Sequence, residues 1–94
     1  MTKVLIRHRV HDYPKWKAEF DKFVNTRRSG GEKSFSIMHP SNDPHDLVLL
    51  FEWDRVENAR TFFESSELQS AMERAGVAEK PAIQFLLEED NGKL

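Results

Sequence analysis

The sequence has 94 residues, which is the size of one domain, and we expect a single domain over residues 1–94. Its formal net charge is −2 and it has no long basic run, so we expect no nucleic-acid partner. The absence of cysteine excludes disulfides, thiolate metal sites and cysteine nucleophiles. We see no signal-peptide pattern and no apolar run long enough for a membrane span, and we therefore expect a cytoplasmic protein without membrane contact.

The N-terminal third predicts a strand followed by a helix. Apolar and polar residues alternate over residues 3–11, which is the period of a strand. One face of this strand carries Val4, Ile6, His8 and Val10. Asp12 is a favourable helix N-cap, and Pro14 suits a first helical turn because its missing amide proton costs nothing there. An aromatic stripe at helical spacing follows, formed by Tyr13, Trp16, Phe20 and Phe23, and Ser29-Gly30-Gly31 should end the helix.

The middle of the chain predicts two strands, and the second contains an unbroken apolar run. Residues 32–39 alternate, with Phe35, Ile37 and His39 on one face. A polar turn over residues 40–45 leads to a strand over residues 46–53, in which Leu47 to Phe51 are all apolar. Successive side chains of a strand point to opposite faces, so this run indicates a central strand that is buried on both faces.

The C-terminal third predicts a helix in two parts and a last strand. An apolar stripe at helical spacing follows Asp54, and Ser65-Ser66 interrupts it before a second helical segment that reaches Gly76. A strand over residues 82–88 follows Pro81 and places Ile83, Phe85 and Leu87 on one face. Residues 90–94 should form a frayed tail.

This order of elements is typical of a ferredoxin-like β-α-β-β-α-β sandwich, an α+β fold with one four-stranded antiparallel sheet and both helices on one side. The helices can then cover only one face of the sheet. The other face carries apolar side chains for which the chain has no cover: Leu5, Met38, Val48, Leu50 and Leu86. An uncovered patch of this kind normally marks an interface, so we expect a homodimer joined through the sheet faces.

Charged residues share that uncovered face. Arg7, Arg9 and Glu52 should all point toward it. Charges on an apolar surface are costly unless they are paired. We therefore expect Arg7 or Arg9 to pair with Glu52, within or between subunits; the alternative is a wet interface.

Four segments carry a combination of residues that is informative about the family. They are Val4 to Val10, Asp12 to Lys17, Leu50 to Asp54, and Ser66-Glu67-Leu68 leading to Ala71-Met72. With these segments the chain resembles the dimeric α+β barrel superfamily and, within it, the antibiotic-biosynthesis-monooxygenase-like (ABM-like) proteins. The resemblance implies a pocket in each subunit between helices and sheet. It does not imply one activity, because the superfamily includes cofactor-free oxygenases of polycyclic aromatics and quinols, haem-degrading enzymes and isomerase-like proteins.

The haem-degrading branch can be compared position by position. Those enzymes carry an Asn on the first strand, a Trp on the second helix and a His ligand further along that helix. The matching residues here are His8, Phe62 and Met72, and none agrees. A neutral imidazole is the usual proximal ligand of haem, so we expect no haem and no other cofactor. The sequence has no cysteine and no His pair at ligand spacing, so we expect no metal site either.

His8 is the polar residue that says most about function. It should point between the sheet and the helices, either as a base for a phenol or an enolisable carbonyl, or as a hydrogen-bonded core histidine. The numerous aromatic residues would suit a flat hydrophobic ligand, although most belong to the core. The candidate pocket residues are Tyr13, Trp16, Trp53, Phe62, Met72 and Phe85. Tyr13 and Trp53 lie at the ends of their elements, where a ring can be half exposed, so we expect both at the rim of the pocket.

Two functions are compatible with the sequence. The first is a small enzyme that oxidises or isomerises an aromatic or quinone-like metabolite without a cofactor, with His8 as the base. The second is a non-catalytic dimeric module that binds a small hydrophobic molecule or serves assembly. The sequence contains no dense polar constellation that would decide between them.

Overall fold

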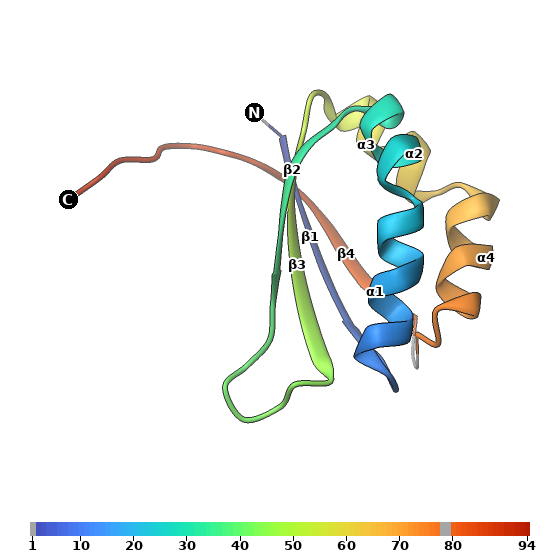
Figure 1. Ribbon diagram of the computed structural model, residues 1–94. Coiled ribbons are helices and arrows are strands. Elements are labelled where there is room, and N and C mark those ends of the chain that lie inside the picture. The colour runs from blue at the N-terminus through green and yellow to red at the C-terminus, as the bar shows by residue number, and fades with distance from the viewer. Residues whose placement is uncertain (1, 78–79) are drawn as a thin grey trace.

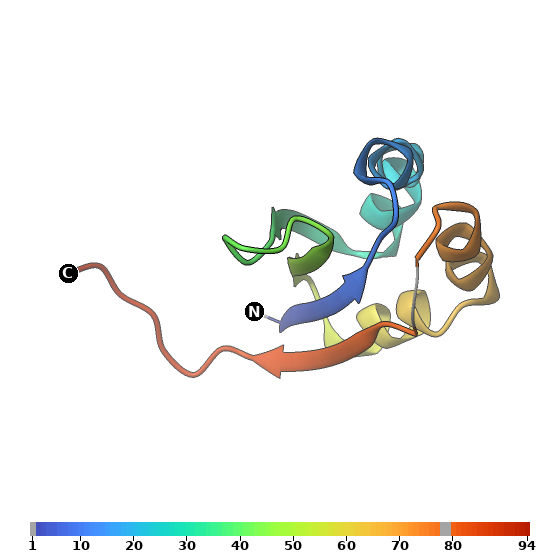
Figure 2. The same ribbon diagram turned by 90° about the horizontal axis from the view of Figure 1, so that it is seen from below.

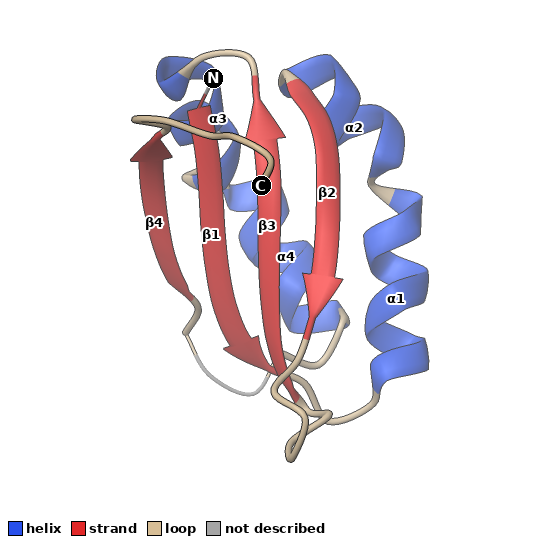
Figure 3. Cartoon of the chain, turned by 90° about the vertical axis from the view of Figure 1, so that its left-hand side faces the viewer, coloured by secondary structure: helices blue, strands red, loops and turns tan. Residues whose placement is uncertain are grey.

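The computed structural model describes residues 2–77 and 80–94. These residues form the elements β1 (Thr2–Arg9), α1 (Tyr13–Lys22), α2 (Val24–Gly30), β2 (Glu32–Met38), β3 (Asp46–Trp53), α3 (Val56–Phe63), α4 (Ser66–Arg74) and β4 (Ala82–Leu87). The strands pair antiparallel in the order β2-β3-β1-β4, and the helices lie on one side of this sheet (Figures 1 and 3). The predicted ferredoxin-like α+β fold is therefore confirmed.

β3 lies inside the sheet because it pairs with both β1 and β2. Its helix-side residues are all buried: Leu47, Leu49, Phe51 and Trp53. The β1–β3 register places His8 opposite Leu47, so His8 also points toward the helices and is buried. The alternation of apolar and polar residues in β1 thus correctly predicted which side chains face the helices. The strand ends at Arg9, however, and Val10 forms an isolated bridge with Val77.

The first helical segment is two helices rather than one, because the helix is interrupted at Phe23. In a continuous helix the carbonyl of Phe20 would accept a hydrogen bond from the amide of Val24. Here it accepts from the amide of Phe23 at 3.2 Å and from Nη1 of the Arg27 side chain. The side chain of Arg27 therefore folds back over the end of α1 and gives this carbonyl a second hydrogen bond.

The start of α1 is capped as predicted. Oδ1 of Asp12 accepts a hydrogen bond from the amide of Lys15 at 3.2 Å. Asp12→Ala should lower the free energy of unfolding by about 1 kcal/mol, which urea denaturation would measure. Asp90→Ala, in the exposed C-terminal tail, serves as the control and should have no effect. Equal stability of the two variants would contradict a capping role for Asp12.

The sheet face without helices, which is turned toward the viewer in Figure 3, combines apolar side chains with ion pairs. Leu5, Val48 and Leu50 are half-buried in the single chain, while Met38 and Leu86 are exposed. Lys3 lies opposite Glu52 in the β1–β3 register and pairs with it at 3.3 Å. These side chains form the outer face, as we call it below.

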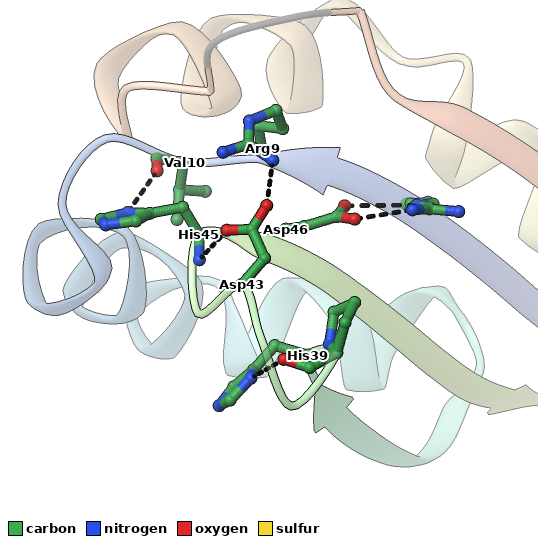
Figure 4. Close-up of polar contacts among 8 residues, drawn as sticks. Arg9, Val10, His39, Asp43, His45 and Asp46 are labelled. Carbon is green, nitrogen blue, oxygen red and sulfur yellow. Dashed lines mark hydrogen bonds and ion pairs between the residues drawn. The ribbon is translucent and has the colours of Figure 1, made fainter.

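The arginines of the outer face pair differently from our expectation. Arg7 binds Asp46 and Arg9 binds Asp43, each with a shortest distance of 2.6 Å (Figure 4). Within the chain, the predicted pairing of either arginine with Glu52 is therefore wrong. The reason is the register: Arg9 lies opposite Asp46 at the far end of β3, whereas Glu52 lies opposite Lys3.

The loop after β2 is held to β1 by the same group of residues. Asp43 accepts a hydrogen bond from the amide of His45 at 3.1 Å, and Nδ1 of His45 lies 3.1 Å from the Val10 carbonyl oxygen (Figure 4).

At the other end of the chain, residues 88–94 belong to no helix or strand and leave the sheet on the side away from the helices (Figures 1 and 2). In the described part of the chain, no helix is long and apolar enough to cross a membrane.

Candidate functional site

A small cavity lies between the sheet and the helices. Its free volume is about 60 Å³, below the roughly 150 Å³ of a protein cavity that binds benzene. The sheet contributes Ile6, His8, Leu49 and Phe51 to its wall, and the helical layer contributes mainly aromatic and aliphatic side chains. Within the described residues, the ionisable groups of this wall are His8, Glu19 and Arg27. An aromatic ring would fit only after wall side chains move, and the unbranched Met72 can adapt in this way.

His8 is the polar group whose environment is most unusual. It is 6% exposed and packs edge-on against Trp16, with 5.7 Å between the ring centroids. Neither Nδ1 nor Nε2 has a hydrogen-bond partner among residues 2–77 and 80–94. Burial lowers the pKa of His8 to about 4, so the imidazole is neutral at neutral pH.

A neutral imidazole offers one N–H donor and one nitrogen acceptor. Leaving such groups buried without a partner costs free energy, which a ligand that supplies the missing hydrogen bonds would recover. We interpreted His8 either as a base or as a hydrogen-bonded core histidine. The described residues provide no hydrogen-bond partner, which argues against the second interpretation. His8 is thus a buried imidazole beside the cavity whose ring nitrogens have no partner among the described residues.

The structure brings together four of the seven candidate site residues. His8, Trp16, Phe62 and Met72 all line the cavity. Tyr13 is 39% exposed at the start of α1 and packs on Trp16, at a ring distance of 5.8 Å, outside the cavity wall. Phe85 also lies outside that wall, edge-on to Phe63 and under the guanidinium of Arg60.

Trp53 differs most from our expectation of a half-exposed rim residue. It is fully buried at the end of β3, and its Nε1 donates a hydrogen bond to the Gly30 carbonyl at 2.9 Å. The glycines at the end of α2 make this possible: a Cβ at Gly31 would lie 2.8 Å from Nε1 of Trp53. Trp53 is therefore a core residue that joins β3 to the end of α2, because the helices close over the end of this strand.

Arg27 is a cavity residue that our sequence reasoning missed. It is 3% exposed, and its Nε lies 3.0 and 3.1 Å from the two carboxylate oxygens of Glu32. Burial raises the pKa of Glu32, and the nearby Arg27 acts in the opposite direction. The available signal was the position of Arg27, which continues the helical spacing of Trp16, Phe20 and Phe23 on the buried side.

These features define an α+β protein with an apolar cavity between its sheet and helices and a neutral imidazole in the cavity wall. No protein-family profile and no curated protein matches the sequence, whereas solved structures do. SnoaB from Streptomyces nogalater, described as a cofactor-independent oxygenase, has a TM-score of 0.76 at 10% identity, over 96% of this chain and 94% of that chain. A conserved protein from Methanosarcina mazei Go1 has a TM-score of 0.73 at 11% identity, over 94% and 92% of the two chains.

A third solved structure is described as an antibiotic biosynthesis monooxygenase. Its TM-score is 0.70 at 12% identity, over 96% of this chain and all of that chain. Likeness at such low identity is evidence of a shared fold. The chain thus has the fold of the ABM-like proteins, and the resemblance seen in its sequence is confirmed at the level of fold.

Proposed function

We propose that the protein binds a small aromatic or quinone-like molecule in this cavity and oxidises it with O₂, without a cofactor. The observation that carries this proposal is His8, a buried and neutral imidazole whose ring nitrogens have no partner among the described residues. The apolar wall around it suits a flat hydrophobic ligand. The shared fold with SnoaB, described as a cofactor-independent oxygenase, supports the class of reaction.

The role of His8 in this reaction is to remove a proton. The acceptor nitrogen takes the proton of a phenolic or enolic hydroxyl, which leaves an anion whose charge spreads to a ring carbon. That carbon forms a bond to O₂, and the resulting peroxide loses water as its O–O bond breaks. The substrate thereby exchanges two hydrogens for one carbonyl oxygen, and the second oxygen atom leaves as water. Protonated His8 is stabilised in the apolar cavity by the anion formed beside it.

We further propose that the protein is a homodimer joined through the outer faces of two sheets. The support is the set of apolar side chains that the helices leave uncovered, among them Leu50 and the exposed Met38 and Leu86. The pocket then belongs to each subunit, on the side of the sheet away from the partner.

Oxygen uptake with a panel of hydroquinones and anthrones tests the oxidation. We expect at least one of them to be turned over, and His8→Leu to lower the rate by roughly 10²- to 10⁴-fold because the general base is lost. His11→Leu removes an exposed histidine and should leave the rate unchanged. A His8→Leu variant with the wild-type rate would exclude His8 as the base, and saturable binding without oxygen uptake would indicate a ligand-binding module instead.

A further inference from the structure

The proposed proton transfer does not use Arg27, although Arg27 also lines the cavity. A guanidinium carries five N–H donors. Nε of Arg27 donates to Glu32, and Nη1 donates to the Phe20 carbonyl. Nη2 makes no hydrogen bond with any residue in the ranges 2–77 and 80–94. Arg27 is thus a buried charged residue with donors to spare.

The position of Arg27 relative to His8 follows from a continuous stack of side chains. His8 packs on Trp16, and Trp16 is stacked on Phe20 with 5.0 Å between ring centroids. The guanidinium carbon of Arg27 lies 3.7 Å from the Phe20 centroid. His8 and Arg27 therefore lie at the two ends of one aromatic wall, formed by Trp16 and Phe20.

The charges of this wall favour a neutral or delocalised acceptor at Arg27. Glu32 already balances the charge of the guanidinium, and the carboxylate of Glu19, another residue of the wall, pairs with Lys22 and Arg74. A full carboxylate on the ligand would be repelled by the like charge of Glu32. A carbonyl oxygen can accept a hydrogen bond from Nη2 without this repulsion. An enolate oxygen that shares its charge with a ring can do the same.

We propose that Arg27 is the second polar anchor of the cavity, and that the ligand is a flat aromatic molecule with two oxygens. A hydroxyl lies at His8, and a carbonyl or enolate oxygen accepts a hydrogen bond from Arg27. The inference rests on the proposed function and extends it to the substrate class. When His8 removes the hydroxyl proton, conjugation carries part of the negative charge to the second oxygen, where Arg27 stabilises it.

The test uses probes that differ by one oxygen. They are para-hydroxybenzaldehyde, para-cresol without the carbonyl, and para-tolualdehyde without the hydroxyl. A second series with the same groups at opposite ends of naphthalene covers a longer span, since two ring systems separate His8 from Arg27. Calorimetry gives the dissociation constants for wild type, His8→Leu and a variant that combines Arg27→Met with Glu32→Leu. The pair is removed together because Arg27→Met alone would leave Glu32 buried without its cation.

In at least one series, we expect wild type to bind the two-oxygen probe roughly tenfold or more tightly than either one-oxygen probe, because each one-oxygen probe lacks one of the two hydrogen bonds. The double variant should lose the preference for the carbonyl and keep the preference for the hydroxyl. His8→Leu should lose the preference for the hydroxyl and keep the preference for the carbonyl. Arg60→Met, which removes an exposed arginine outside the cavity, should change neither preference.

The outcomes separate the two proposals. A folded double variant that keeps the carbonyl preference overturns the role of Arg27 and leaves the proposed function intact. Failure of wild type to bind any probe, or a hydroxyl preference that survives His8→Leu, overturns both. If circular dichroism shows that the double variant is unfolded, Arg27→Lys decides: it keeps the positive charge but lacks the second amino group, and it should lose the carbonyl preference.

Discussion

Leu50→Lys should convert the proposed dimer into a monomer or an aggregate. Leu50 lies on β3 in the middle of the outer face and is half-buried even in the single chain. A standard interface buries on the order of 1,500 Å², and at roughly 25 cal/mol per Å² its apolar part contributes about 20 kcal/mol before the costs of association. A lysine at Leu50 would be buried between two sheets without a partner or would hold them apart.

Multi-angle light scattering at micromolar concentration measures this effect directly. Val24→Lys is the matched control, because Val24 is also an exposed apolar residue but lies on the helical layer. It should leave the dimer unchanged. Wild type that is monomeric at micromolar concentration would exclude the sheet-to-sheet dimer and leave the outer face without an assigned partner.

The stability of the protein should fall between pH 6.5 and pH 4 because of His8. The pKa of His8 is about 4 in the folded protein and 6.5 when unperturbed, so the unfolded chain binds a proton more readily than the folded one. The contribution of the neutral imidazole is complete above pH 6.5 and is lost as the pH falls. At about 1.4 kcal/mol for each pH unit between the two values, the loss is about 3 kcal/mol at pH 4.

Urea denaturation at pH 7.0, 5.5 and 4.5 would show this loss as a falling midpoint in wild type. In His8→Leu the fall should be smaller by the contribution of His8, since leucine has no proton to bind. The carboxylates Asp43 and Asp46 should interfere little in this window, because hydrogen bonds from Arg9 and Arg7 lower their pKa values. The same midpoint shift in both proteins would show that His8 titrates normally and is accessible to water.

The facing of the strands follows from the sequence because it is a local property. Alternation in β1 places His8 among Val4 and Ile6, and the structure buries all three on the helix side. The apolar run from Leu47 to Phe51 likewise identified a strand that pairs on both edges. Side chains two residues apart share a face in any strand, so these predictions needed no knowledge of distant contacts.

On the helical side of the sheet, the helix ends and the burial of individual side chains could be known only from the tertiary structure. Phe23 fits the helical spacing, yet the helix is interrupted there and the Arg27 side chain folds back onto the Phe20 carbonyl. Arg27 carries a charge that in most helices would face water, and its burial becomes possible through Glu32, which follows on β2. Trp53 lies at the end of its strand, where only the approach of α2 and α3 decides whether the ring is covered.

The chemical state of His8 is also decided by the tertiary structure. Its inward orientation is set by the strand period, but its pKa and the absence of a hydrogen-bond partner among the described residues depend on which side chains surround it. Those neighbours come from α1, from β3 and from the helices after β3, far apart along the chain. The sequence by itself therefore determined the fold and the direction of this imidazole. Tertiary packing decided that it is neutral and has no hydrogen-bond partner in residues 2–77 and 80–94, because desolvation is a property of the whole environment.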